Sequence, residues 1–173
     1  MKTIVIYRSK TGFTKRYARW IAEAAGAECV ELSKARKKNL DAYEAIVFGG
    51  GAYAGRISGL SWFKGNMDKW NGKQLIVFCV GANPADRPEI EPALKSNFQE
   101  TELQKIQLFY CPGGLNYEKM SVLSRLMMKF FVKTLQAKKN KTRDDEEMIQ
   151  IISSSYDISD KKYIKPILSV LSK

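Results

Sequence analysis

Several absences narrow what this chain can do. It contains no histidine, which excludes Ser-His-Asp and Cys-His hydrolases and any metal site that imidazole ligates. The three cysteines, Cys29, Cys79 and Cys111, form no CxxC pair, so we expect inert, buried thiols rather than a zinc site or a dithiol redox centre. Any chemistry of this protein is therefore expected to come from a bound cofactor.

Long hydrophobic runs are also missing, and acidic residues are few. No apolar run approaches the length needed to cross a bilayer, and Lys2 leads into a strand-like segment rather than a signal peptide, so we expect a cytoplasmic protein. The 29 Lys and Arg outnumber the 18 Asp and Glu and give a formal net charge of +11. Such a field favours nucleic acid, an acidic protein, an anionic membrane or a carboxylate-bearing substrate, and a solvated basic surface explains it equally well.

Strand-like apolar segments recur along the 173 residues, which suit a single domain. They cover residues 4–7, 28–32, 43–48, 74–80 and 105–110. Helical patterns lie between them: one with Tyr17, Ile21 and Ala24 on one face, one around Trp62, Phe63 and Met67, and one within residues 89–98. This alternation predicts an α/β domain with a parallel sheet.

Two connecting regions complete this organisation. Residues 33–38 read as an exposed basic loop, and residues 49–51 as a glycine loop after the third strand. A final helix is expected over residues 159–171, capped by Ser159 or Asp157 and kinked or split by Pro166.

The first strand-like segment runs through a small polar turn into a helix. The first turn of a helix leaves backbone N–H groups unpaired, hydroxyl groups add donors, and glycine lets the backbone approach a ligand closely. The pattern therefore predicts a phosphate site, although it lacks both GxxxxGK[ST] and GxGxxG. The alternative is a plain turn whose hydroxyls only cap the helix. The residues concerned are Ser9, Lys10, Thr11, Gly12, Phe13 and Thr14.

This stretch resembles the flavodoxin signature. The resemblance implies a flavodoxin-like three-layer α/β sandwich with a five-stranded parallel sheet in the order 2-1-3-4-5. It also implies FMN as cofactor, with its terminal phosphate wrapped by residues 9–14. The matching residues are Val5, Ile6, Tyr7, Ser9, Gly12, Thr14, Ala18 and Ile21.

Two more loops are expected beside the cofactor, because ligands of such sheets bind at the carboxyl ends of the strands. The loop after the third strand offers the Tyr53 ring for stacking, and it resembles the loop that borders the isoalloxazine ring in flavodoxin-domain proteins related to menaquinone-dependent protoporphyrinogen dehydrogenase. In the loop after the fourth strand, the Asn83 amide either bonds the polar edge of the flavin or forms an Asn-Pro turn. The predicted residues are Gly51, Ala52, Tyr53, Ala54 and Gly55 in the first loop, and Gly81, Ala82 and Asn83 in the second.

A basic insert over about residues 117–147 follows the fifth strand and precedes the final helix. If it is helical, Met120, Leu123, Leu126, Met127, Phe130 and Phe131 share one broad face. Three alternatives stay open: this helix lies on an anionic membrane, covers a substrate beside the flavin, or packs its apolar face on the domain. Its cations are Lys119, Arg125, Lys129, Lys133, Lys138, Lys139, Lys141 and Arg143, and an acidic block follows at residues 144–147.

The insert also resembles that of the protoporphyrinogen dehydrogenase relatives, so the resemblance to this group extends over nearly the whole chain. The insert departs from that family at Glu118, Lys119, Met120 and Ser121, where the family has Tyr, Arg and Trp. We therefore predict an FMN-dependent oxidoreductase that passes electrons between an organic substrate and a quinone-type acceptor. The alternative is a non-catalytic electron carrier that docks on a protein partner. Peripheral contact with the inner face of the membrane through residues 119–143 is a further option. No catalytic side chain and no metal site are identified, and no motif supports a nucleic-acid partner.

Overall fold

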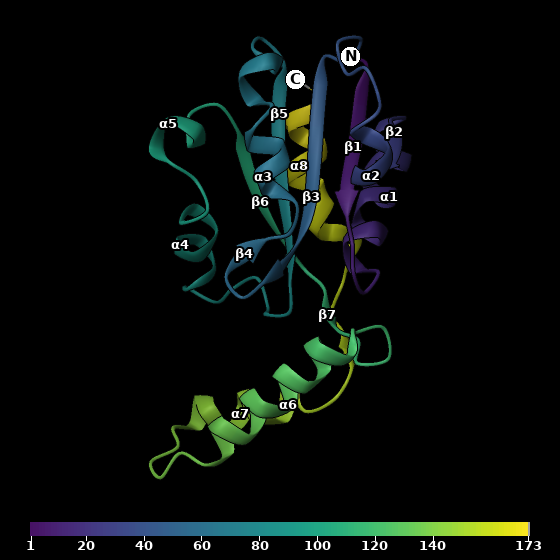
Figure 1. Cartoon of the computed structure of the whole chain (residues 1–173). Coiled ribbons are helices and arrows are strands. Elements are labelled where there is room, and N and C mark those ends of the chain that lie inside the picture. The colour runs from purple at the N-terminus through teal and green to yellow at the C-terminus, as the bar shows by residue number, and fades with distance from the viewer. Residues whose placement is uncertain (173) are drawn as a thin grey trace.

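A parallel sheet forms the centre of the computed structural model, which describes residues 1–172 (Figure 1). The strand order β2-β1-β3-β5-β6 is the predicted 2-1-3-4-5 order, and a short strand β4 pairs antiparallel with β3. All five strands on the main path run parallel to their neighbours. The strands are β1 (Thr3–Arg8), β2 (Glu28–Glu31), β3 (Ala45–Tyr53), β4 (Arg56–Ile57), β5 (Gln74–Gly81) and β6 (Gln107–Pro112).

Helices cover both faces of this sheet and complete three layers (Figure 1). Helix α1 (Phe13–Ala25), the 3-10 helix η2 (Lys161–Ile164) and α8 (Lys165–Leu171) pack on one face. The other face carries α2 (Leu32–Ala35), α3 (Leu60–Lys64), the 3-10 helix η1 (Met67–Trp70), α4 (Ile90–Lys95) and α5 (Glu100–Leu103). The predicted flavodoxin-like architecture is confirmed.

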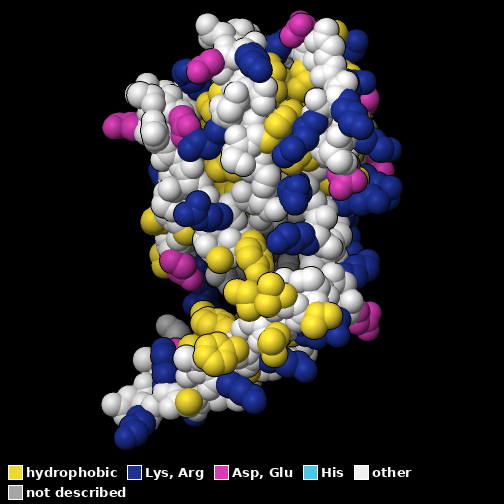
Figure 2. Space-filling model, viewed as in Figure 1, with side chains coloured by type: hydrophobic (Ala, Val, Ile, Leu, Met, Phe, Trp, Pro, Cys, Tyr) yellow, Lys and Arg dark blue, Asp and Glu magenta, His cyan; other side chains and the backbone are white. Residues whose placement is uncertain are grey.

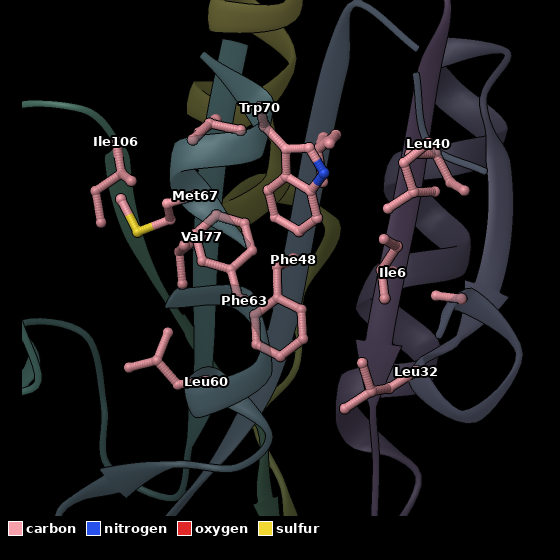
Figure 3. Close-up of a cluster of buried hydrophobic side chains, with 14 of the residues drawn as sticks. Ile6, Leu32, Leu40, Phe48, Leu60, Phe63, Met67, Trp70, Val77 and Ile106 are labelled. Atoms are coloured by element: carbon pink, nitrogen blue, oxygen red, sulfur yellow. The ribbon is translucent and has the colours of Figure 1, made fainter. Parts of the chain in front are cut away.

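The core consists of two clusters, one on each face, because side chains alternate along every strand. In β5, Val77 belongs to one cluster and Ile76 and Phe78 belong to the other. Figure 3 shows the first cluster, in which the Phe63 ring lies 5.4 Å from the centres of both the Phe48 and the Trp70 rings. Burial on both faces explains why these strands are almost continuously apolar.

Several local predictions were wrong, each for a physical reason. Residues 49–51 continue strand β3 rather than forming a loop. Gly49 and Gly50 pair with β1, and all three glycines pair with β5. The basic segment 33–38 is partly the helix α2, whose Ala35 is buried. Ala24 is exposed, since the buried face of α1 runs instead through Tyr17, Ala18 and Ile21.

The remaining boundaries differ more modestly. The helix expected around Trp62 is divided into α3 and η1, and α5 was not expected. Pro166 splits the last helix as predicted, since it stands in the first turn of α8 directly after η2. The cap of η2 is Asp160, whose carboxylate accepts a hydrogen bond from the Lys162 N–H at 2.8 Å.

The insert is a helical hairpin on a two-stranded neck. Strand β7 (Gly114–Leu115) pairs antiparallel with β8 (Tyr156–Asp157), and between them lie α6 (Val122–Gln136) and α7 (Arg143–Ile152). The acidic block begins α7, where Thr142 and Asp145 form a capping box. The hairpin projects from the end of the molecule at which the strands finish (Figure 1). Within residues 1–172, no helix is long and apolar enough to cross a membrane.

Candidate functional site

Two local features determine the conformation of the turn after β1. The Gly12 N–H donates a hydrogen bond to the Ser9 hydroxyl at 3.1 Å, and Gly12 itself has a φ of 102°. Side chains other than hydrogen are strained at this φ, so glycine suits the position. Helix α1 begins at the next residue, Phe13. Ser9 therefore shapes the turn that leads into the helix.

The start of α1 offers donors to an anion. In the described chain the N–H groups of Phe13, Thr14 and Lys15 have no hydrogen-bond partner, as is usual for the first turn of a helix. Thr14 is only 3% exposed, and its hydroxyl oxygen lies 3.4 Å from the position that a Cβ at Gly51 would take. The helix dipole adds to the attraction of negative charge. These features fit a phosphate group.

The second predicted loop supplies an aromatic side chain. Strand β3 ends at Tyr53, and a two-residue turn with positive φ at Ala54 and Gly55 returns the chain as β4. The Tyr53 ring is 40% exposed, and the Lys10 ammonium lies 4.1 Å from its centre. A cation over a ring face is an attractive contact, so it holds the phosphate turn against this loop.

The third predicted loop is fixed through its backbone. The Ala82 carbonyl accepts a hydrogen bond from the Tyr156 hydroxyl at 2.8 Å, and the Asn83 carbonyl accepts one from the Tyr110 hydroxyl at 2.8 Å. Burial raises the pKa of Tyr156 to about 12, so this hydroxyl keeps its proton and stays a donor. The contact joins the loop directly to the neck of the insert.

One cavity of about 880 Å³ brings the three loops together at the carboxyl ends of β1, β3 and β5. Of the predicted residues, Lys10, Thr11, Phe13, Thr14, Gly51, Ala52, Tyr53, Ala54, Gly81 and Ala82 line it. Ser9, Gly55 and Asn83 do not, and Gly12 lines a smaller adjoining hollow with Thr11 and Phe13. The insert closes another side of the cavity with Met120, Ser121, Ser124, Met127, Met128 and Phe131.

Sequence reasoning missed several lining residues. Arg8 could have been found, since it ends β1 at the edge where ligands bind. Ser58 lies beyond the turn after Tyr53, and only its lining of the cavity identifies it. Lys119 belongs to the insert, yet its ammonium lies 3.7 Å from the position that a Cβ at Gly12 would take. Nothing in the sequence indicates that Lys119 and Gly12 lie close together.

The cavity is positively charged. Arg8, Lys10 and Lys119 line it, and no Asp or Glu is found among its described lining residues. Among the side chains that the structure describes, no group of three or more His, Cys, Asp or Glu is placed to hold a metal ion. The donor set therefore suits an anion attached to a flat, largely apolar group, because Tyr53 and the methionines lie beside the cationic turn.

Several solved structures are similar to this chain in fold. A flavodoxin from the domain Archaea is 16% identical, with 100% of both chains covered and a TM-score of 0.46. The WrbA-like flavodoxin from Agrobacterium tumefaciens is 25% identical over 72% of this chain and 87% of its own, with a TM-score of 0.44. The Trp repressor binding protein from Bacillus subtilis is 18% identical over 81% of this chain and 100% of its own, with a TM-score of 0.48. These similarities are too distant to carry an argument about function.

The family assignment depends on the sequence itself. No curated protein matches the chain significantly. A family model described as a flavodoxin domain matches residues 4–142, which is most of the chain and includes all three loops. FMN carries both a phosphate and a flat ring, so it matches the donors at the start of α1 and the ring of Tyr53. The chain belongs to the flavodoxin domain family, and this membership supports FMN as its cofactor.

Proposed function

We propose that this protein is an FMN-dependent oxidoreductase that passes electrons between an organic substrate and a quinone-type acceptor. The observation that carries the proposal is the wall that α6, together with Met120 just before it, adds to the cavity. Met120, Met127, Met128 and Phe131 present apolar groups there. The Tyr53 hydroxyl lies 3.4 Å from the Met127 sulfur, so this wall reaches the loop expected to flank the cofactor ring. The cavity volume of about 880 Å³ lies toward the upper end of the usual range for small-molecule sites, which is compatible with a reactant beside the cofactor.

In this proposal, different residues of the site bind the phosphate and the ring of FMN. The free N–H groups at the start of α1 and the Thr14 hydroxyl hold the phosphate, and Lys10 and Lys119 neutralise its charge. Tyr53 stacks on the ring. When bound, FMN supplies the uptake and release of electrons. The α6 wall positions the reactants and keeps bulk water from part of the cavity.

The proposed overall reaction balances without another reagent. The organic substrate loses two electrons and two protons, and the quinone gains two electrons and two protons to become a quinol. The described lining residues include no carboxylate, so the protons move through water or the hydroxyls of Ser58, Ser121 and Ser124.

Porphyrinogen is the first substrate to test, because the sequence resembles protoporphyrinogen dehydrogenase relatives. The start of the insert differs from that family at residues 118–121, and in this structure Lys119, Met120 and Ser121 line the cavity. A substrate that bears carboxylates suits the cationic lining.

The experiment begins with a visible absorption titration of the protein with FMN, followed by anaerobic reduction and mixing with soluble quinones. We expect tight FMN binding and rapid reoxidation by quinone. Changing Met128 and Phe131 to serine should leave FMN affinity nearly unchanged and slow the reaction with quinone about tenfold, because these residues lie on the α6 side of the cavity.

Other outcomes lead to different conclusions. Reversible reduction without turnover of any small-molecule pair favours the electron carrier that docks on a protein partner. Failure to bind FMN would mean that the turn at residues 9–14 only connects β1 to α1, and it would overturn the proposal.

A further inference from the structure

Helix α6 carries an apolar surface that the protein does not cover. Val122, Leu123, Leu126 and Phe130 are 84%, 66%, 62% and 72% exposed, and none of them lines the cavity. We call these four residues the outer face of α6. Six of the ten exposed large hydrophobic residues in the described chain lie on this helix. Figure 2 shows hydrophobic side chains gathered over α6 and the adjoining end of the α/β body. The alternative in which the apolar face packs on the domain is therefore wrong for these positions.

Cations flank the outer face. Lys129 and Lys133 stand one turn apart on α6, next to Leu126 and Phe130 in the helical projection. Neither lysine makes an ion pair with any side chain that the structure describes, whereas Lys138 pairs with Asp145 and Arg143 pairs with Glu147. Two cations near the far end of the hairpin are therefore paired with acidic residues, whereas the two lysines beside the outer face have no partner among the described side chains.

The cavity opens next to this face. Met127 and Phe131 line the cavity, and they are also 49% and 46% exposed, so each belongs both to the cavity wall and to the surface. They follow Leu126 and Phe130 by one residue each, which places them on the adjacent side of the helix. A reactant that leaves an apolar phase at the outer face therefore meets the cavity directly.

These observations favour one occupant. A second copy of the chain would bring another charge of +11 and the same lysines to the contact, which opposes association. An anionic surface is attracted instead. A helix of 15 residues is about 22 Å long, and an apolar face with flanking lysines is typical of helices that lie in the interface plane of a bilayer.

We propose that α6 docks on a lipid bilayer that carries anionic headgroups. The outer face enters the boundary of the acyl chains, and Lys129 and Lys133 contact the headgroups. Met127 and Phe131 then border an opening through which a lipid-soluble acceptor passes from the bilayer to the cavity. This last step depends on the proposed function, whereas the docking itself does not.

The test measures binding of the FMN-loaded protein to vesicles by flotation. Vesicles of phosphatidylcholine with phosphatidylglycerol should carry the protein to the top of the gradient, and pure phosphatidylcholine vesicles should not. Changing Leu126 and Phe130 to serine should weaken binding at least about 100-fold, because two buried side chains are lost. Changing Lys129 and Lys133 to glutamine should weaken it about 30-fold.

A matched control separates local contact from overall charge. Lys34 and Lys37 are exposed near α2 on the α/β body, and changing both to glutamine removes the same net charge far from the insert (Figure 1). This variant should bind vesicles within about twofold of the unchanged protein. If the two double lysine-to-glutamine variants bound vesicles equally weakly, the attraction would come from net charge alone, which would contradict the proposal.

Two further outcomes also contradict it. The first is absence of vesicle binding in a protein that binds FMN. The second is a dimer, detected by light scattering, that disappears when Leu126 and Phe130 are changed. Vesicle binding without any electron transfer to quinone would overturn the proposed function and leave the docking surface intact.

Discussion

At the scale of single residues, the site depends on backbone geometry as much as on side chains. The strand, the turn and the helix start around residues 9–14 could be predicted from sequence. The phosphate contact of this turn stays a prediction, because hydroxyl groups at a strand–helix turn also serve as helix caps. The Asn83 side chain was also predicted beside the cofactor, yet Asn83 does not line the cavity and its carbonyl accepts from Tyr110. An amide followed by proline indicates a turn and a ligand contact equally well, so sequence could not separate the two.

Gly12 offers a prediction with a close control. Gly12→Ala should lower the free energy of unfolding by about 1 kcal/mol, because Gly12 has a φ of 102°, and should weaken FMN binding about tenfold by reshaping the turn. Gly26→Ala carries a similar conformational cost at a φ of 60°, but it lies at the far end of α1. We expect the same loss of stability there without a change in FMN affinity. Equal weakening of FMN binding by both substitutions would contradict this role of Gly12.

Tyr53 provides a second prediction. Tyr53→Ala should weaken FMN binding about tenfold, since an aromatic contact is lost together with the ring on which the Lys10 ammonium sits. Tyr53→Phe keeps the ring and removes only the hydroxyl beside the Met127 sulfur, so its FMN affinity should stay within about twofold. Calorimetric titration of both variants tests this. A loss with Phe as large as that with Ala would assign the effect to the hydroxyl.

At the scale of elements, strand order was predictable and element boundaries were less so. Alternating apolar segments determine which segments become strands, and right-handed crossovers leave few orders for them. The glycines at residues 49–51 favour a loop by intrinsic propensity, yet pairing with two neighbouring strands makes them part of β3. Pro166 was predicted correctly because its effect is covalent and local.

The neck of the insert leads to a prediction about pH. Asp157 in β8 pairs with Arg16 of α1, and the Ser159 hydroxyl and N–H also donate to its carboxylate. Partial burial raises the pKa of Asp157, but the hydrogen bonds from Ser159 and Arg16 outweigh it and hold the pKa below 3.8. The carboxylate therefore stabilises the protein above this ordinary value and loses that effect as the pH falls through the folded-state pKa.

Asp157→Asn measures this contribution. Because both partners are more than a third exposed, we expect the free energy of unfolding in urea to fall by less than about 1 kcal/mol at pH 7. The difference between the two proteins should be constant from pH 7 to about 5 and should shrink at more acidic pH. A difference that grows as the pH falls would contradict the assigned direction.

At the scale of the whole molecule, the charge distribution separates this protein from flavodoxins that carry electrons, which are typically acidic. The net charge was evident from the sequence, but the presence of Arg8 and Lys119 beside Lys10 in the lining of the cavity was not. Lys119 reaches the phosphate turn only because the β7–β8 neck returns the insert to the carboxyl ends of the strands. Tyr156 fixes that return by donating to Ala82. Tertiary geometry therefore places a cation where sequence showed only a basic segment.

This charge should raise the reduction potential of the bound cofactor. Arg8, Lys10 and Lys119 line a cavity without acidic side chains among its described residues, and cations stabilise an anionic reduced flavin. Changing Lys10 or Lys119 to glutamine should lower the potential of the last electron taken up by about 20–60 mV, which corresponds to a few-fold to tenfold change in that equilibrium. Lys34→Gln, on the α/β body, should shift it far less, because salt screens distant exposed charges. Potentiometric titration measures all four proteins, and an unchanged potential in both cavity variants would show that the local cations do not tune the cofactor.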